Sequence, residues 1–384
     1  MRKKLFSLFI VAILCATALT FTGCGSASSD TIKIGALGPY SGDTAQYGTA
    51  TRDGIQLAVD EINDAGGING QQVELITYDT KGDSTEAVNA YNRLRDQDGV
   101  VAIVGSVLSA ESLAIKDLAK ADNMPIVTPT STAADVTIDA DNSFRVCYLD
   151  EMQGKAAANF ATMSTDEKGL GATTAVVLEC SGNAYSEGLS EAFSKQFEAN
   201  GGQILDTESY AAQDKDFSAQ LTKLKSMNAD VLYIPDYYSV VGPILQKAKE
   251  IGITATCLGG DGWDSVQEEY ADAAEGEYFA NHYAADSPSE VVQNFIKTYT
   301  DTYDQAPNSF AALGYDSMNV MKSAIEKAGS TDADAIIEAL GDSEFDGVTG
   351  SFTFDENGDP SGKEITIIKI VNGALTYQTT VSSN

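Results

Sequence analysis

The strongest constraint on the fold is an alternation of short apolar runs with longer segments whose apolar residues recur at helical spacing. Strand-like runs occur at 32–37, 73–78, 100–104, 125–127 and 144–148, and helical spacing occurs between them at 49–65, 84–98 and 110–121. Strands that alternate with helices form parallel sheets with helices on both faces. The sequence therefore predicts an α/β fold with a Rossmann-like first lobe, a parallel sheet flanked by helices.

The same alternation starts again in the second half of the chain. It predicts strands at 174–178, 204–210, 231–234, 256–258 and 276–283, with helices at 187–199, 217–227 and 241–251. Further helices at about 289–303, 311–328 and 333–340 precede strands at 350–354, 364–370 and 374–379. These last elements exceed what a second sheet needs, so we expect the chain to cross between two lobes more than once and to form a multi-strand hinge.

We expect two lobes because about 360 residues exceed what one hydrophobic core usually organises. The predicted N-terminal lobe comprises residues 32–149 plus about 281–355. The predicted C-terminal lobe comprises residues 150–280 plus about 356–384. In such folds a ligand sits outside the carboxyl ends of the strands, here in a cleft between the lobes.

The N-terminus has the features of an export signal. Arg2, Lys3 and Lys4 precede an apolar run, and small residues lead to Cys24, as in a bacterial lipoprotein processing site. We predict a signal peptide at 1–23, lipidation of Cys24 and a flexible Ser-rich tether at 24–31. The alternative is an ordinary signal peptide with an incidental cysteine. Either way the protein is expected outside the cytoplasm, lipid-anchored to the cell membrane, or periplasmic if the host has an outer membrane.

The charge balance limits the possible partners. The chain has 56 acidic and 24 basic residues, a formal net charge of −32. Such an excess argues against nucleic acid and against a mature surface lying on anionic lipid. Besides Cys24, the cysteines that remain after removal of the predicted signal peptide are Cys147, Cys180 and Cys257. They lie in or beside apolar runs without metal-ligand spacing, so we expect buried free thiols. A disulfide between two of them is the alternative.

Common catalytic and metal motifs are missing. The sequence contains no GxGxxG, GxxxxGK[ST], GxSxG or HExxH. His282 is the only histidine, which excludes a His-centred metal site and disfavours a Ser-His-Asp triad. The segment Asp355–Asp359 resembles the start of a calcium loop, but Pro360 and Thr366 replace the required Gly and Glu. Asn357-Gly358 favours a hairpin turn there, and we predict neither metal nor cofactor.

The segment PIVTPTSTA (125–133) is a candidate binding turn. It leads from a buried strand into hydroxyl-bearing residues, among them Thr130 and Thr132. Hydroxyls and free backbone N–H groups at a strand end can hold a small charged ligand, above all a carboxylate. The alternative is a loop that only caps the next element.

Several segments together resemble one family. They are GALGPYSGDTAQYG (35–48), NDAGGINGQQVEL (63–75), VGS…S (104–109), PIVTPTSTA (125–133), NAYSEG (183–188), DFSAQLTKLK (216–225) and FDENGDPSG (354–362). In order and spacing this set is similar to the type I periplasmic binding proteins of the leucine/isoleucine/valine-binding kind. Those proteins are the extracellular receptors of ABC amino-acid importers. The resemblance covers residues 32 to about 378.

The resemblance implies a site for an amino-acid zwitterion. Ser109 and Thr132 match residues that bind the ligand α-carboxylate, and the carbonyl of Thr130 matches an acceptor for the α-ammonium. Asp261 matches the acidic partner of that ammonium, where branched-chain receptors usually have Glu. From the residues alone, Asp261 could instead be a turn residue or a helix cap.

The resemblance also implies which residues surround the ligand. Tyr185 and Tyr237 match aromatic residues of the closing lobe, Tyr47 matches an aromatic near the side-chain pocket, and Phe310 and Trp263 match pocket walls. A core role for Tyr185 and Tyr237 is the alternative. The disulfide of the family falls on Gly82 and Leu108 here, so this chain must do without it.

The predicted function is that of a non-enzymatic receptor that captures an L-amino acid, most simply a branched-chain one, and presents it to the permease and ATPase subunits of an ABC importer. We expect a monomer. The alternatives are a receptor of the same fold for another small amide or acid, such as urea, a short amide or an aromatic acid, a ligand-sensing domain, or an enzyme.

Overall fold

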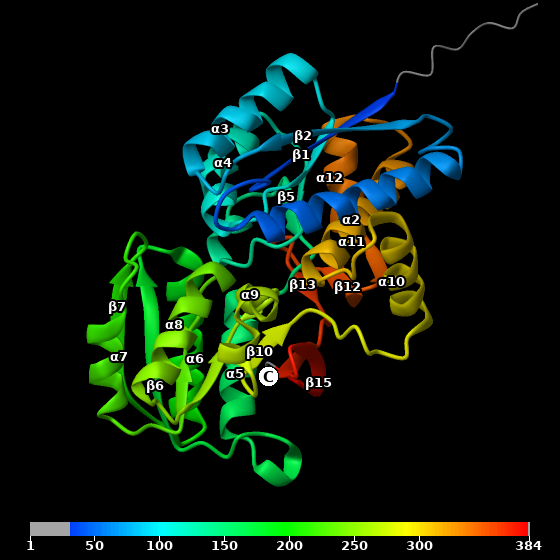
Figure 1. Ribbon diagram of the computed structural model, residues 1–384. Coiled ribbons are helices and arrows are strands. Elements are labelled where there is room, and N and C mark those ends of the chain that lie inside the picture. The colour runs from blue at the N-terminus through cyan, green and yellow to red at the C-terminus, as the bar shows by residue number, and fades with distance from the viewer. Residues whose placement is uncertain (1–30, 383–384) are drawn as a thin grey trace, which may run out of the picture.

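The computed structural model describes residues 31–382. It contains two α/β bodies, each built around a sheet flanked by helices, which confirms the predicted fold class (Figure 1). In Figure 1 the blue and cyan elements form the upper body together with orange ones, and the green elements form the lower body together with the red C-terminal strand. The predicted signal peptide 1–23, Cys24 and nearly all of the tether lie outside the described residues.

The first sheet is wholly parallel and has the strand order β2-β1-β3-β4-β5. Its strands are β1 (Ile32–Gly38), β2 (Val73–Asp79), β3 (Ala102–Gly105), β4 (Ile126–Thr128) and β5 (Ser143–Arg145). Every residue of β3 and β4 is buried because helices cover both faces. The helices of this lobe are α2 (Ala45–Asp64), α3 (Ser84–Arg93), α4 (Ser109–Ala121), α10 (Glu290–Tyr303), α11 (Ser309–Ala328) and α12 (Ala333–Gly341).

Alternate residues of β3 define the two faces of that sheet. Ala102 and Val104 pack in a core with residues of α2, α11 and α12. Ile103 between them packs with residues of α3 and α4. The late helices α11 and α12 therefore complete the first lobe, although they follow the whole second sheet in sequence.

The second sheet has the order β15-β14-β10-β9-β8-β6-β7, and β14 runs antiparallel to both of its neighbours. Its strands are β6 (Thr174–Ser181), β7 (Gln203–Ala211), β8 (Val231–Tyr233), β9 (Thr256–Gly259), β10 (Tyr278–Asn281), β14 (Ile365–Val371) and β15 (Ala374–Val381). The helices of this lobe are α5 (Asp150–Thr162), α6 (Ala184–Ala199), α7 (Ser218–Lys225), α8 (Tyr238–Ile251) and α9 (Val266–Ala274). Cores on its two faces contain α5 and α6 on one side and α7 and α8 on the other.

Three segments connect the lobes, following β5, β10 and β13 (Figure 1). A small antiparallel sheet of β11 (Glu344–Gly347), β12 (Gly350–Phe354) and β13 (Pro360–Ser361) precedes the third segment. Phe352 and Phe354 of β12 pack in the core of the first lobe. The chain thus crosses more than once, as its excess of late elements suggests, while the residue limits of each lobe stay a prediction.

The turn between β12 and β13 is a hairpin, as Asn357-Gly358 predicts. Asp355 accepts hydrogen bonds from the backbone of Asn357 and Asp359, and the Asp359 carboxylate pairs with the buried Arg145. These carboxylates are therefore already engaged by protein groups. No group of three or more His, Cys, Asp or Glu side chains within residues 31–382 is arranged to hold a metal ion.

Helix α5 is absent from the elements that the sequence predicts. Its buried residues include Ala156, Ala157, Ala158, Phe160 and Ala161, so that apolar residues cover much of its circumference rather than one stripe. Consecutive small apolar residues give no clear helical period, because the helix is packed on several sides. The three cysteines of the described chain are buried and unpaired, in line with the expected free thiols.

Candidate functional site

The predicted ligand-binding residues gather where strands of both sheets end. Ser109 begins α4 after β3, and Thr130 and Thr132 follow β4. In the other lobe Tyr185 follows β6 and Asp261 follows β9. Because the carboxyl ends of parallel strands share one edge of a sheet, each lobe brings its residues to the same rim.

The wall from the first lobe is built from hydroxyl groups and turn backbone. The Ser109 hydroxyl accepts a hydrogen bond from the backbone N–H of Ala133 at 3.2 Å, and the Thr130 hydroxyl donates to the carbonyl oxygen of Val107 at 2.6 Å. These bonds tie the PIVTPTSTA turn to the loop that precedes α4. The start of α4 adds free N–H groups and the positive end of the helix dipole, so this wall favours an anion.

Thr132 lies deeper and adjoins the first residue of α5. Its carbonyl oxygen accepts the backbone N–H of Asp150 at 3.0 Å, and both side chains are buried. Burial raises the pKa of the Asp150 carboxyl well above its ordinary value, and the nearby Thr132 hydroxyl opposes that rise. Thr132 thus connects the binding turn to the first segment that crosses between the lobes.

The wall from the second lobe centres on the Asp261 carboxylate, which is only 3% exposed. Its Oδ1 accepts the Tyr185 hydroxyl at 2.9 Å and the Gln153 side-chain amide at 3.1 Å. Its Oδ2 lies 2.9 Å from Nε2 of His282. A buried carboxylate with three neighbouring donor groups is a suitable partner for a cation.

A small cavity between the lobes joins the two walls. Its lining comprises Val107, Leu108, Ser109, Thr130 and Phe310 from the first lobe, and Tyr185, Tyr237, Asp261 and Gly262 from the second. A wall that carries hydroxyl groups therefore faces a carboxylate across one small cavity. Six of the nine residues that the sequence assigns to the ligand site line this cavity.

Residues 31–374 match the family of periplasmic binding proteins. The chain belongs to this family, in its type I, leucine/isoleucine/valine-binding branch. It is 32% identical over 345 residues to the leucine-, isoleucine-, valine-, threonine- and alanine-binding protein of Pseudomonas aeruginosa, which covers 89% of this chain and 90% of the relative.

Solved structures of periplasmic binding proteins agree with this assignment. A leucine-binding protein of Thermotoga maritima superposes with a TM-score of 0.86 at 36% identity, covering 92% of this chain and 99% of the other. The branched-chain amino-acid substrate-binding protein of Streptococcus pneumoniae, solved with isoleucine, gives a TM-score of 0.84 at 32% identity, with the same coverage of both chains.

Tyr47 does not line the cavity itself but packs behind Phe310, which does. Its ring stacks on Phe310 with centroids 4.1 Å apart, and it is completely buried. Its hydroxyl donates to the carbonyl oxygen of Gly262 and accepts the backbone N–H of Tyr238 at 2.9 Å. Because Tyr47 belongs to α2 and both partners belong to the second lobe, these bonds hold the lobes together.

Trp263 takes a different position from the one expected of a pocket wall. Its indole N–H donates to the carbonyl oxygen of Ile234 at 2.7 Å, and its ring packs against Gly259 in the core of the second lobe. It does not line the cavity. Tyr185 and Tyr237 stack with centroids 5.0 Å apart and do line it, so their rings form one continuous wall.

Two residues beside Asp261, Gln153 and His282, are not among those that the sequence assigns to the ligand site. Gln153 lies 108 positions from Asp261, and its side chain both donates to Oδ1 and accepts the backbone N–H of Asp261. No short-range signal in the sequence connects either residue with Asp261, because only the packing of α5 and the end of β10 brings them together.

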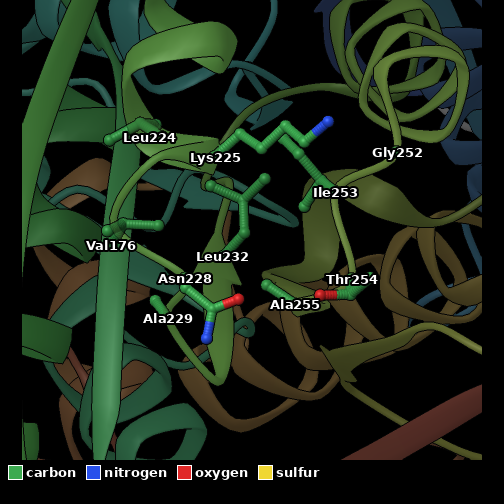
Figure 2. Close-up of a pocket in the computed structure, with 10 residues that line it drawn as sticks. All are labelled: Val176, Leu224, Lys225, Asn228, Ala229, Leu232, Gly252, Ile253, Thr254 and Ala255. Carbon is green, nitrogen blue, oxygen red and sulfur yellow. The ribbon is translucent and has the colours of Figure 1, made fainter.

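Figure 2 shows a second cavity that lies away from this site. It is lined by residues such as Val176, Leu232 and Ala255, which lie at or before the starts of strands in the second sheet. The amino ends of these strands are opposite the rim that carries Asp261. Lys225, the charged residue in its lining, already donates to the carbonyl oxygen of Ile251.

Within the described residues no helix is both long and apolar enough to span a bilayer.

Proposed function

We propose that this protein captures an L-amino acid of the branched-chain class, leucine, isoleucine or valine, between its lobes and delivers it to the permease and ATPase subunits of an ABC importer. The observation that carries the proposal is the pairing of Ser109 and Thr130 on one wall of the cavity with Asp261 on the other. A zwitterion needs a partner for each of its two charges, one at each end of its backbone.

The physical reason is the cost of removing two charges from water. An unpaired buried charge is costly, so a closed site must offer a partner to each end of the ligand. In the proposed arrangement Ser109, Thr132 and the N-terminus of α4 bind the α-carboxylate. Asp261 and the carbonyl of Thr130 bind the α-ammonium. Charge-assisted hydrogen bonds of this kind contribute about 1.5–3 kcal/mol each.

The apolar part of the lining supports an aliphatic side chain in the ligand. Val107, Leu108 and Phe310 contribute apolar surface next to the two poles and carry no charge. The names of the relatives from Pseudomonas aeruginosa and Streptococcus pneumoniae refer to branched-chain amino acids, which supports the same class. Burying a Leu-sized side chain contributes about 1.5–3 kcal/mol.

In this proposal the protein is a receptor that releases its ligand unchanged, acts outside the cytoplasm as a monomer, and is held at the membrane by a lipid on Cys24. The sequence pattern that ends at Cys24 supports the anchor. Membrane fractionation of cells that produce the wild-type and Cys24→Ala proteins tests it. Recovery of both proteins in the same soluble fraction would contradict lipidation.

Calorimetric titration of the purified protein tests the ligand class. We expect L-leucine, L-isoleucine and L-valine to bind with dissociation constants of about 1 μM or below. Such constants correspond to a binding free energy of roughly −8.2 kcal/mol or a more negative value. Asp261→Ala should weaken binding at least about 100-fold, because the ammonium then lacks its counter-charge in a buried site.

The matched control is Asp301→Asn, which removes a carboxylate from the exposed surface of α10 and should leave affinity unchanged. Benzoate and urea, which lack the α-ammonium, should not bind. Binding of benzoate without leucine would overturn the amino-acid class. Full affinity in Asp261→Ala would overturn the role of Asp261.

A further inference from the structure

His282 is the only histidine of the chain, and it lies at the end of β10, where the chain leaves the second sheet. Its side chain is 0% exposed, and its ring stacks on Tyr148 with centroids 3.8 Å apart. Tyr148 belongs to the segment that crosses between the lobes after β5. The imidazole of one crossing segment therefore packs against a tyrosine of another, with Nε2 directed at Asp261.

From this juxtaposition we propose that His282 is a positioning residue: its Nε2–H donates to Oδ2 of Asp261 and fixes the carboxylate in the orientation that receives the ligand ammonium. The proposal rests on the proposed function, which makes Asp261 the ammonium partner. The Asp261 carboxylate can present one fixed orientation to a ligand only if neighbouring groups hold it there.

The three side chains that hold Asp261 leave its negative charge available. Gln153 and Tyr185 are neutral donors to Oδ1, and burial raises the pKa of the Tyr185 hydroxyl well above its ordinary value. A neutral His282 adds a third dipole without adding charge. An arginine or lysine in the same place would neutralise the carboxylate and compete with the ligand for it.

The surroundings of the ring favour the neutral form with the proton on Nε2. Nδ1 is buried and has no hydrogen-bond partner among the described residues. A doubly protonated ring would leave a buried N–H unsatisfied, whereas the Nε2–H tautomer leaves only a lone pair. Asp261 and Asp264, which follow β9, and Lys363, which precedes β14, are the charged groups that act on it.

These groups set the direction of the pH effect. Burial lowers the pKa of His282 below its ordinary value of 6.5, the hydrogen bond and charge of Asp261 oppose that change, and the Lys363 ammonium reinforces it. As pH falls through that pKa, the imidazolium forms an ion pair with Asp261. Affinity for the amino acid therefore decreases toward acid, and ligand binding displaces a proton from any protonated His282.

The single histidine allows a direct test on the ligand-free protein. Imidazole ¹⁵N chemical shifts should report a neutral ring with the proton on Nε2 at pH 7.5, and the Nε2 resonance should move in Asp261→Asn. A ring with its proton on Nδ1, or a charged ring at pH 7.5, would overturn the proposal. This measurement needs no ligand, so it stands even if the proposed function fails.

Titrations with L-leucine between pH 5 and 8 provide the functional test. His282→Ala should weaken binding about 10- to 100-fold at pH 7.5, as expected for the loss of a hydrogen bond to a charged group. His282→Gln retains an N–H donor and should stay within about threefold of wild type.

The wild-type affinity should fall toward acid more steeply than that of His282→Gln, which keeps the donor but does not titrate. The affinity of His282→Gln at pH 7.5 serves even if His282→Ala fails to fold. Unchanged affinity in His282→Ala, or a loss of about tenfold or more in His282→Gln at pH 7.5, would overturn the positioning role. Absence of leucine binding by the wild type at every pH would instead count against the proposed function.

Discussion

At the scale of single residues, buried carboxylates shape the second wall of the site. Asp236 lies between β8 and α8, and its Oδ1 accepts the backbone N–H of Tyr237 at 2.7 Å. Its Oδ2 accepts the hydroxyl of Tyr210. Asp236 thus fixes the start of α8, from which Tyr237 reaches the cavity. Burial raises the pKa of Asp236 from its ordinary value of 3.8 to about 6, against the effect of both hydrogen bonds.

This raised pKa predicts how stability depends on pH. A group that binds its proton more tightly in the folded state stabilises the protein below its unfolded pKa, and that stability is lost as pH rises through the folded pKa. Asp236→Asn removes the effect but keeps the side-chain shape. Between pH 4 and pH 7 the free energy of unfolding of Asp236→Asn should therefore rise relative to that of wild type by about 2 kcal/mol.

Urea unfolding of both proteins at several pH values in this range measures that difference. Parallel stability profiles for wild type and Asp236→Asn would show that Asp236 keeps an ordinary pKa in the folded protein.

At the scale of elements, the crossing of α2 with α11 aligns two aromatic residues of the first wall. Gly54 of α2 lies so close to α11 that a Cβ added there would be 2.0 Å from the carbonyl oxygen of Ala311. Gly314 of α11 is equally close to Thr51, since its Cβ would be 2.3 Å from that carbonyl oxygen. This close approach of two backbones brings Tyr47 and Phe310, on the same two helices, into their stacked pair.

Gly54→Ala should therefore destabilise the protein, although alanine is the better helix former. The helices must separate to accept the methyl group, which costs about 1–3 kcal/mol or more. Gly341→Ala is the matched control, because no atom lies within 4 Å of a Cβ at that position of α12. Chemical denaturation of both variants measures the effect. Equal stability of the two variants would contradict a tight helix crossing.

At the scale of the whole molecule, the lobes are joined by hydrogen bonds that do not involve a ligand. Besides the bonds of Tyr47, the Asp264 carboxylate of the second lobe accepts the backbone N–H of Ser309 at 2.8 Å and its hydroxyl at 2.6 Å. Ser309 begins α11 in the first lobe, so Asp264 also interacts favourably with the positive end of that helix. Both contacts lie beside the cavity and bias the molecule toward the closed arrangement.

Tyr47→Phe should shift this balance toward an open form. The change removes the hydroxyl that bonds both Gly262 and Tyr238 and leaves two backbone groups without that partner, at a cost of about 1–3 kcal/mol. Small-angle X-ray scattering of the ligand-free variant should give a larger radius of gyration than wild type. An unchanged scattering profile would mean that Tyr47 does not hold the lobes together. The lost bonds should also lower affinity for the amino acid.

The sequence by itself determined the alternation of strands and helices, because the hydrophobic periodicity that distinguishes them depends only on residues close together in the chain. Through a resemblance to one family it also predicted ligand-binding roles for Ser109, Thr130 and Asp261, and the structure places all three in the lining of one cavity. It did not predict the position of Trp263, whose indole N–H donates to the carbonyl oxygen of Ile234 in the core. It also predicted no helix in the alanine-rich segment that forms α5.

Only the tertiary structure decided which groups surround Asp261 and what closes the cleft. Gln153 is 108 positions away from Asp261 along the chain, and Tyr47 is 215 positions away from Gly262. Such pairs arise where two sheets meet and three segments cross between them. Local patterns specify elements, whereas contacts between distant elements depend on how those elements pack. This packing placed His282 beside the Asp261 carboxylate.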